Sequence, residues 1–84
     1  MEKVRVGKIS HYYPKIGVAV VEVEAALKIG DKISIESNET NFQQTVGSMQ
    51  IDRTPIKEAK KGSSIGMKVE NAVKEHDIVY KEKK

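Results

Sequence analysis

The chain has no cysteine and no tryptophan, and its 84 residues include only two prolines, two histidines, three tyrosines and one phenylalanine. The lack of cysteine excludes disulfide bonds, thiolate zinc sites and a cysteine nucleophile. The longest unbroken apolar run, residues 18–21, is far shorter than the roughly 20 residues that cross a membrane. Residues 1–5 lack the apolar segment of a secretory signal. We therefore expect a cytoplasmic protein that does not contact a membrane.

Residues that carry catalysis or bind metal are also scarce. His11 and His76 are the only histidines, and neither stands at the spacing of metal ligands or beside a nucleophile signature. The six glycines form neither a GxxxxGK[ST] nor a GxGxxG phosphate loop. We therefore predict no catalytic residue, metal, cofactor or nucleotide. A small hydrolase or isomerase would require one of these histidines beside a buried carboxylate.

Apolar residues recur at every second position in short segments, which is the pattern of half-buried β-strands. The pattern predicts an all-β domain over residues 1–80, with residues 81–84 as a flexible charged tail. Gly7 and Gly47 stand where the alternation changes phase, so we expect bulges there. Six short strands with bulges favour a small closed barrel, because closure removes exposed strand edges. The expected strands cover residues 4–13, 16–23, 32–36, 42–51, 65–69 and 78–80.

The net charge of +3, from 15 basic and 12 acidic residues, is unevenly distributed along the chain. Basic residues gather in residues 1–15, around a histidine and two tyrosines, and again in residues 53–61. Cations that neutralise phosphates and exposed aromatic rings that stack on bases are the features of RNA-binding surfaces. The alternative is that the lysines are solvated, and strand alternation sends one of the two tyrosines into the core. The candidate RNA-binding residues are Lys8, His11, Tyr12, Tyr13, Lys15, Arg53, Lys60 and Lys61.

Six segments form a recognisable series along the chain: VGKI (6–9), GVAVVEV (17–23), LKIGDKI (27–33), VGSMQI (46–51), IKEAKKGSSIGM (56–67) and DIVY (77–80). Taken in this order, they resemble the second domain of translational GTPases such as elongation factor Tu. The resemblance covers nearly the whole chain and implies a Greek-key barrel of six or seven strands. The chain is also similar to free-standing elongation-factor-like proteins and to the barrel appended to collagenase-like peptidases.

The resemblance implies one further site residue. In elongation factor Tu this domain helps to hold the aminoacyl end of transfer RNA, with a carboxylate and an arginine near the end of the strand that corresponds to residues 49–53. Arg53 matches the arginine, Gln50 stands in place of the carboxylate, and Ser64 replaces an asparagine. Gln50 therefore joins the candidates, although a GTP-driven cycle is excluded because the phosphate loop is missing.

Two functions are consistent with these features. The first is a noncatalytic binder of RNA or a ribonucleoprotein, related to transfer RNA or the ribosome. The second is a protein-docking module, a detached accessory domain of a larger complex such as a collagenase-like peptidase. We expect a monomer in either case. The first function requires Arg53, Lys60 and Lys61 to share one face with Lys8 and Lys15.

Overall fold

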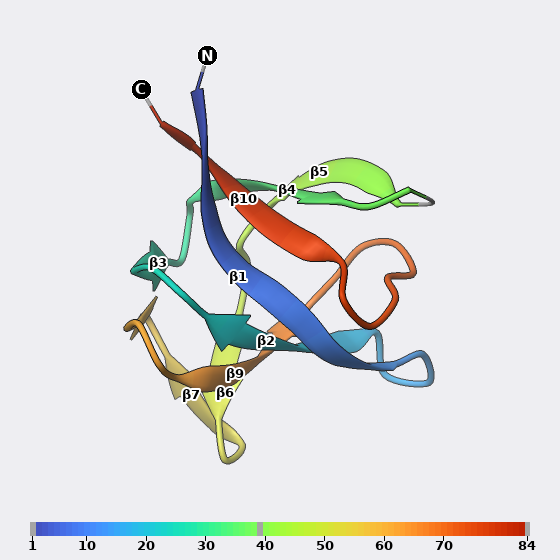
Figure 1. Ribbon diagram of the computed structural model, residues 1–84. Helices are drawn as coiled ribbons and strands as arrows, with labels where there is room; N and C mark the ends of the chain where they lie inside the picture. The colour runs from blue at the N-terminus through green and yellow to red at the C-terminus, as the bar shows by residue number, and fades with distance from the viewer. Residues whose placement is uncertain (1, 39, 84) are drawn as a thin grey trace.

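The computed structural model describes residues 2–38 and 40–83, and within them the chain forms ten β-strands and no helix (Figure 1). Accordingly, no helix in these ranges is long and apolar enough to cross a membrane. The strands are β1 (Glu2–Tyr13), β2 (Val18–Val23), β3 (Leu27–Lys28), β4 (Lys32–Glu36), β5 (Asn41–Thr45), β6 (Met49–Ile51), β7 (Thr54–Ile56), β8 (Glu58–Ala59), β9 (Ser64–Lys68) and β10 (Ile78–Lys83).

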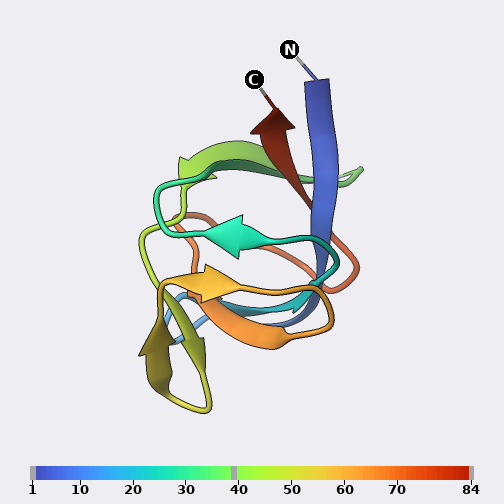
Figure 2. The same ribbon diagram turned by 90° about the vertical axis from the view of Figure 1, so that its left-hand side faces the viewer.

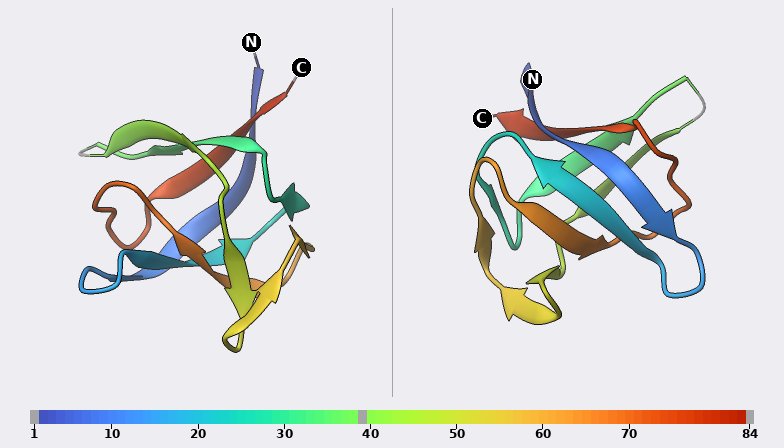
Figure 3. Two further views of the ribbon diagram at one scale, coloured as in Figure 1. Left: turned by 180° about the vertical axis from the view of Figure 1, so that it is seen from behind. Right: turned by 60° about the horizontal axis from the view of Figure 1, so that its bottom comes forward.

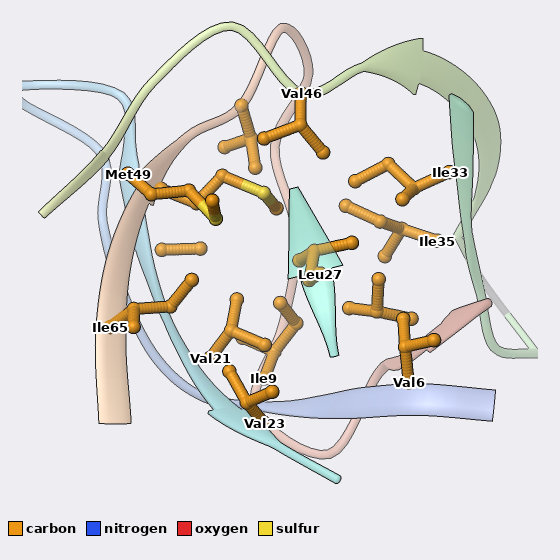
Figure 4. Packing of buried hydrophobic residues seen from close by; sticks show 14 of the residues in the cluster. Val6, Ile9, Val21, Val23, Leu27, Ile33, Ile35, Val46, Met49 and Ile65 are labelled. Atoms are coloured by element: carbon orange, nitrogen blue, oxygen red, sulfur yellow. The ribbon is translucent and has the colours of Figure 1, made fainter. Parts of the chain in front are cut away.

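Eight strands form one antiparallel sheet in the order β5-β4-β10-β1-β2-β9-β6-β7. This sheet curls around a single core, and the two-stranded sheet of β3 and β8 lies across its remaining side (Figure 2). The core consists of aliphatic side chains and two methionines that point inward from both sheets (Figure 4). Leu27 of β3 and Ala59 of β8 are fully buried, so the small sheet covers the core.

The all-β class is confirmed, but the closed barrel of six or seven strands is not. Among the described residues, β5 and β7 end the eight-stranded sheet, and no strand pairing joins them. The reason lies in residues 42–51, which were expected to form one strand with a bulge at Gly47. Val46 N–H instead donates to the carbonyl of Asp31, so the chain stays beside β4 as far as residue 46. It then crosses through residues 46–48 to β6, which pairs with β9.

The bulge expected at Gly7 is confirmed. The register between β1 and β10 shifts between Arg5 and Gly7. A Cβ atom at Gly7 would lie 2.7 Å from Cγ1 of Val21 and 2.9 Å from the carbonyl oxygen of Glu22. Such contacts are too short for any side chain, so the close approach of β1 to β2 at this point requires glycine.

The prediction of a flexible tail at residues 81–84 is wrong for residues 81–83, the part that the structure describes. Residues 81–83 are the end of β10 and pair with the start of β1, and Lys84 lies outside the described residues. Lys81 pairs with Val4 in the ladder, and its Nζ lies 3.2 Å from Oδ2 of Asp31. Backbone pairing needs no apolar side chain, which is why the charged sequence did not reveal this strand. The first residues of β1 and the last of β10 project together as a two-stranded arm that carries both termini (Figures 1 and 3).

Candidate docking surface

The aromatic candidates of β1 lie on opposite faces of the strand. Tyr12 packs against the core, whereas Tyr13 is 47% exposed. The ring of His11 meets the ring of Tyr13 edge-on, with centroids 4.4 Å apart, because alternate residues of a strand share a face. The Nδ1 atom of His11 lies 3.4 Å from Oε1 of Glu75. One exposed tyrosine and one packed against the core is the arrangement that the alternation predicted.

The basic candidates do not converge on one face. Lys15 lies in the turn before β2, whereas Lys60 and Lys61 lie in the turn after β8. That second turn is fixed beside the far end of β2, because Gly62 N–H donates to the carbonyl of Val23 at 2.8 Å. The six residues of β2 therefore separate the two sets of lysines by roughly 17 Å. The sequence alone could not show this, because it gives no distance between segments.

Gln50 and Arg53 occupy a third place. Gln50 is exposed on β6, where it pairs with Pro55 and Gly66. Arg53 is exposed in the two-residue turn between β6 and β7, at the bottom of Figure 1. Lys8, in the middle of β1, is only half exposed. The nine candidate residues are thus distributed over several turns and strands rather than gathered in one site.

Cross-strand ion pairs engage part of the basic surface. The guanidinium of Arg5 on β1 lies 2.9 Å from the carboxylate of Glu24, and Lys3 pairs with Glu36 of β4. Lys28 of β3 lies 3.5 Å from Glu58 of β8. The basic residues at the start of β1 are therefore matched by acidic residues from other segments, and the charge cluster that the sequence suggested is not a free cationic face.

Histidine and acidic side chains do not gather into a metal site in the part of the chain that the structure describes. Within residues 2–38 and 40–83, no group of three or more histidine, aspartate or glutamate side chains could hold a metal ion. Asp77 is buried next to the exposed His76, but its carboxylate accepts a hydrogen bond of 2.9 Å from the Lys74 N–H. Asp77 therefore holds the turn before β10. His76 and Asp77 line a shallow hollow together with Ser37, whose hydroxyl oxygen accepts a hydrogen bond from Thr40 N–H.

An apolar groove lies at the base of the two-stranded arm, and we call it the arm groove. It is lined by Val4 and Val6 of β1, by Ala25 and Ala26 after β2, and by two charged residues of β10, Lys81 and Glu82. Its volume is about 200 Å³. Val4 is 40% exposed although it is apolar. Small side chains in the loop after β2 leave this hollow open, and no motif in the sequence indicates it. The arm groove thus combines apolar lining with two charged residues at its rim, a mixture found at the contact surfaces of proteins.

Comparisons with known proteins identify relatives among proteases. No family model matches the chain. The chain is 39% identical over 79 residues to the uncharacterized protease MJ0090 of Methanocaldococcus jannaschii, an alignment that covers 93% of this chain and 19% of that protein. It is 33% identical over 82 residues to a collagenase of Porphyromonas gingivalis, covering 95% of this chain and 20% of the collagenase. The chain thus spans about a fifth of the length of these relatives.

The fold is that of a domain solved by crystallography. The C-terminal domain of a Geobacillus thermoleovorans protein described as a U32 peptidase superposes with a TM-score of 0.88, at 21% sequence identity. The superposition covers 94% of this chain and 92% of the solved chain. A selenomethionine variant of the same domain gives a TM-score of 0.86 at 19% identity. The agreement over most of both chains shows that they share one fold.

These findings correct the sequence-based assignment. The assignment to the second domain of translational GTPases is wrong. The proteins that match nearly the whole chain are a protease, a collagenase and the C-terminal domain of a U32 peptidase. The function in RNA or ribonucleoprotein binding, which depended on that resemblance, is overturned with it. The scattered positions of the basic candidates agree with this correction.

Proposed function

We propose that the chain is a noncatalytic accessory domain that docks onto the catalytic part of a collagenase-like protease. The observation that carries this proposal is the extent of the sequence similarity: it covers 93% of this chain but only 19% of the Methanocaldococcus protease. The remaining four-fifths of that relative must hold its proteolytic machinery if the matching fifth holds none.

The arm groove is the proposed contact surface. In the Geobacillus protein the superposed domain is C-terminal, so the rest of that protein enters the domain through its first strand. The corresponding strand here is β1, and Val4 near its start lines the arm groove. A catalytic part joined to the start of β1 would therefore lie closer to this groove than to the other surfaces of the domain. The occupant that fits is therefore an apolar surface of the protease with a basic group beside Glu82, since Lys81 is already paired with Asp31.

The test uses a defined partner. The Methanocaldococcus protease without its matching segment would be mixed with this chain, and complex formation would be followed by isothermal titration calorimetry. We expect a one-to-one complex that Val4→Lys weakens by about tenfold or more, because a buried charge replaces an apolar contact. Ile16→Lys is the matched control, since Ile16 is 63% exposed in the turn between β1 and β2, away from the groove. Absence of a complex, or equal weakening by both variants, would refute the proposal.

A further inference from the structure

The outer edge of β5 presents main-chain groups that point away from the sheet. β5 pairs with β4 alone, with Phe42 opposite Ile35 and Gln44 opposite Ile33. Hydrogen bonds at the two ends of this ladder fix its phase: Ser37 N–H donates to the carbonyl of residue 40, and Val46 N–H donates to that of residue 31. Bonded and non-bonded pairs alternate along an antiparallel ladder. The main chain at Phe42 and Gln44 therefore faces β4.

The same alternation turns the main chain at Asn41, Gln43 and Thr45 outward. Their N–H and C=O groups have no hydrogen-bond partner among the described residues, because β5 is the end strand of the sheet. Three donors and three acceptors thus stand at alternate positions along one edge, which is the template that a further β-strand needs.

This edge lacks the protection that the opposite edge of the sheet has. β7 contains Pro55 and follows Arg53, and proline and charged residues are the usual means by which edge strands resist pairing. β5, with the sequence NFQQT, has neither a proline nor a charged residue. Figure 3 shows β5 on the outside of the curled sheet, beyond β4. The two ends of one sheet therefore differ in how readily they accept another strand.

Shallow grooves flank the second half of β5 on both sides. One, of about 210 Å³, lies over the outer face of β4 and β5 and includes Lys32 and Glu82. The other lies between β5 and the segment that follows β9, and includes Lys68 and Glu70. Side chains of an added strand alternate between two faces, so each groove could receive every second side chain. Each groove carries one positive and one negative residue, which favours no particular charge in the ligand.

We propose that the outer edge of β5 binds an extended segment of the protease's polypeptide substrate, adding it as a ninth strand to the sheet. This assignment rests on the proposed function for the identity of the ligand. Main-chain hydrogen bonds recognise any extended polypeptide, and shallow grooves of mixed charge suit a ligand of variable sequence. A five-residue edge buries far less than the roughly 1,200 Å² typical of a stable dimer, so a second copy of this chain fits less well.

The first measurement uses the unchanged domain. Reduced, carboxymethylated α-lactalbumin, a permanently unfolded polypeptide, would be added to the isotopically labelled chain and followed by amide NMR. The binding edge predicts that the amides of Asn41, Gln43 and Thr45 shift and become protected from hydrogen exchange, while those of Phe42 and Gln44 change less. Shifts confined to another part of the molecule would overturn the assignment.

The second measurement compares two substitutions at one residue. Gln43→Pro removes the outward N–H without breaking the ladder to β4, because that N–H makes no bond within the sheet. Gln43→Thr keeps the N–H and is the matched control. We expect Gln43→Pro to weaken binding of the unfolded polypeptide by about tenfold or more, with Gln43→Thr close to wild type. Equal affinities of the two variants for the polypeptide would refute the assignment of the β5 edge as the binding site.

Other occupants give different results. A dimer in sedimentation experiments that Gln43→Pro abolishes would make the occupant a second copy and overturn the proposal. The polypeptide assay contains no protease, so its failure is separate from failure of docking through the arm groove. If the chain binds the unfolded polypeptide but not the protease, the β5 edge stands as a binding site and the docking function is refuted. If it binds the protease but not the polypeptide, the docking function stands and the binding site at β5 is refuted.

Discussion

The side-chain oxygen of Gln44 accepts a hydrogen bond of 2.9 Å from the backbone N–H of Glu70, and the amide nitrogen of the same side chain donates to the carbonyl of Lys68 at 3.0 Å. Gln44 is on β5, at one end of the eight-stranded sheet, and its partners are the last residue of β9 and the segment beyond it. The residue is 7% exposed. One carboxamide therefore connects two parts of the curled sheet that no strand pairing joins among the described residues.

Replacing Gln44 by methionine should destabilise the domain by about 1–3 kcal/mol, because two part-buried hydrogen bonds are lost and their two backbone partners are left without them. Methionine has a similar volume, so packing changes little. The unfolding free energy would be measured by urea titration. Gln43→Met is the control, since Gln43 is exposed on the same strand, and its effect should stay within about 0.5 kcal/mol. A Gln44→Met variant as stable as the control would show that this link contributes nothing.

The sequence predicted the features that depend on local pattern. The all-β class follows from alternation, and so does the difference between the packed Tyr12 and the exposed Tyr13. The phase change at Gly7 marked a real bulge. The same signal at Gly47 was misleading, because a phase change looks alike whether a strand bulges or the chain leaves the sheet. Only the long-range bond between Val46 and Asp31 decides that case.

The features that the sequence missed depend on distance and on the main chain. Lys15 and Lys61 belong to similar basic segments, yet β2 separates them in the fold. The end of β10 is charged and carries no apolar pattern, yet its main chain pairs with β1. The free edge of β5 and the arm groove likewise arise from which strands lie side by side. No local pattern at Val4 or Gln43 contains that information.

Gly7→Ala should destabilise the domain by about 1–3 kcal/mol, because the added methyl group would lie 2.7 Å from Val21 and 2.9 Å from the main chain of Glu22. The backbone oxygen cannot move without opening the β1–β2 ladder. Gly47→Ala is the matched control, since a Cβ atom there meets nothing within 4 Å. It should be neutral, or stabilising by about 0.4–1 kcal/mol through the unfolded state. Thermal unfolding of both variants provides the comparison, and equal midpoints would contradict the close contact at Gly7.

The turn between β6 and β7 should tolerate glycine better than arginine. Asp52 and Arg53 have φ angles of 50° and 65°, so both central residues of this two-residue hairpin are left-handed. Turns of this kind favour glycine at the second position, because other residues pay a steric cost there. Arg53→Gly should therefore stabilise the domain by about 0.5–1 kcal/mol in urea unfolding. Arg53→Ala removes the same charge but keeps the steric cost, so a similar gain in both variants would attribute the effect to charge.

The stability of the domain should fall in acid partly through Glu36. A hydrogen bond from the Lys3 ammonium, and then one from the Ser34 hydroxyl, lower the pKa of this carboxyl from its ordinary value of 4.5. A carboxyl with a lowered folded-state pKa binds its proton more readily in the unfolded chain. Its contribution to stability is therefore complete above the unfolded pKa and is lost as the pH falls through the folded pKa.

Urea midpoints from neutral pH down to about pH 3 would test this behaviour. Glu36→Gln should be less stable than wild type at neutral pH, and the difference should shrink as the pH falls below 4.5 and through the lowered folded-state pKa, because the wild-type carboxyl then becomes neutral like the glutamine amide. Glu22→Gln, which removes a carboxylate from the exposed end of β2, should follow the wild-type curve. If the gap between Glu36→Gln and wild type stays constant across the titration, the ion pair with Lys3 does not contribute to folding, and the acid sensitivity must come from another carboxylate.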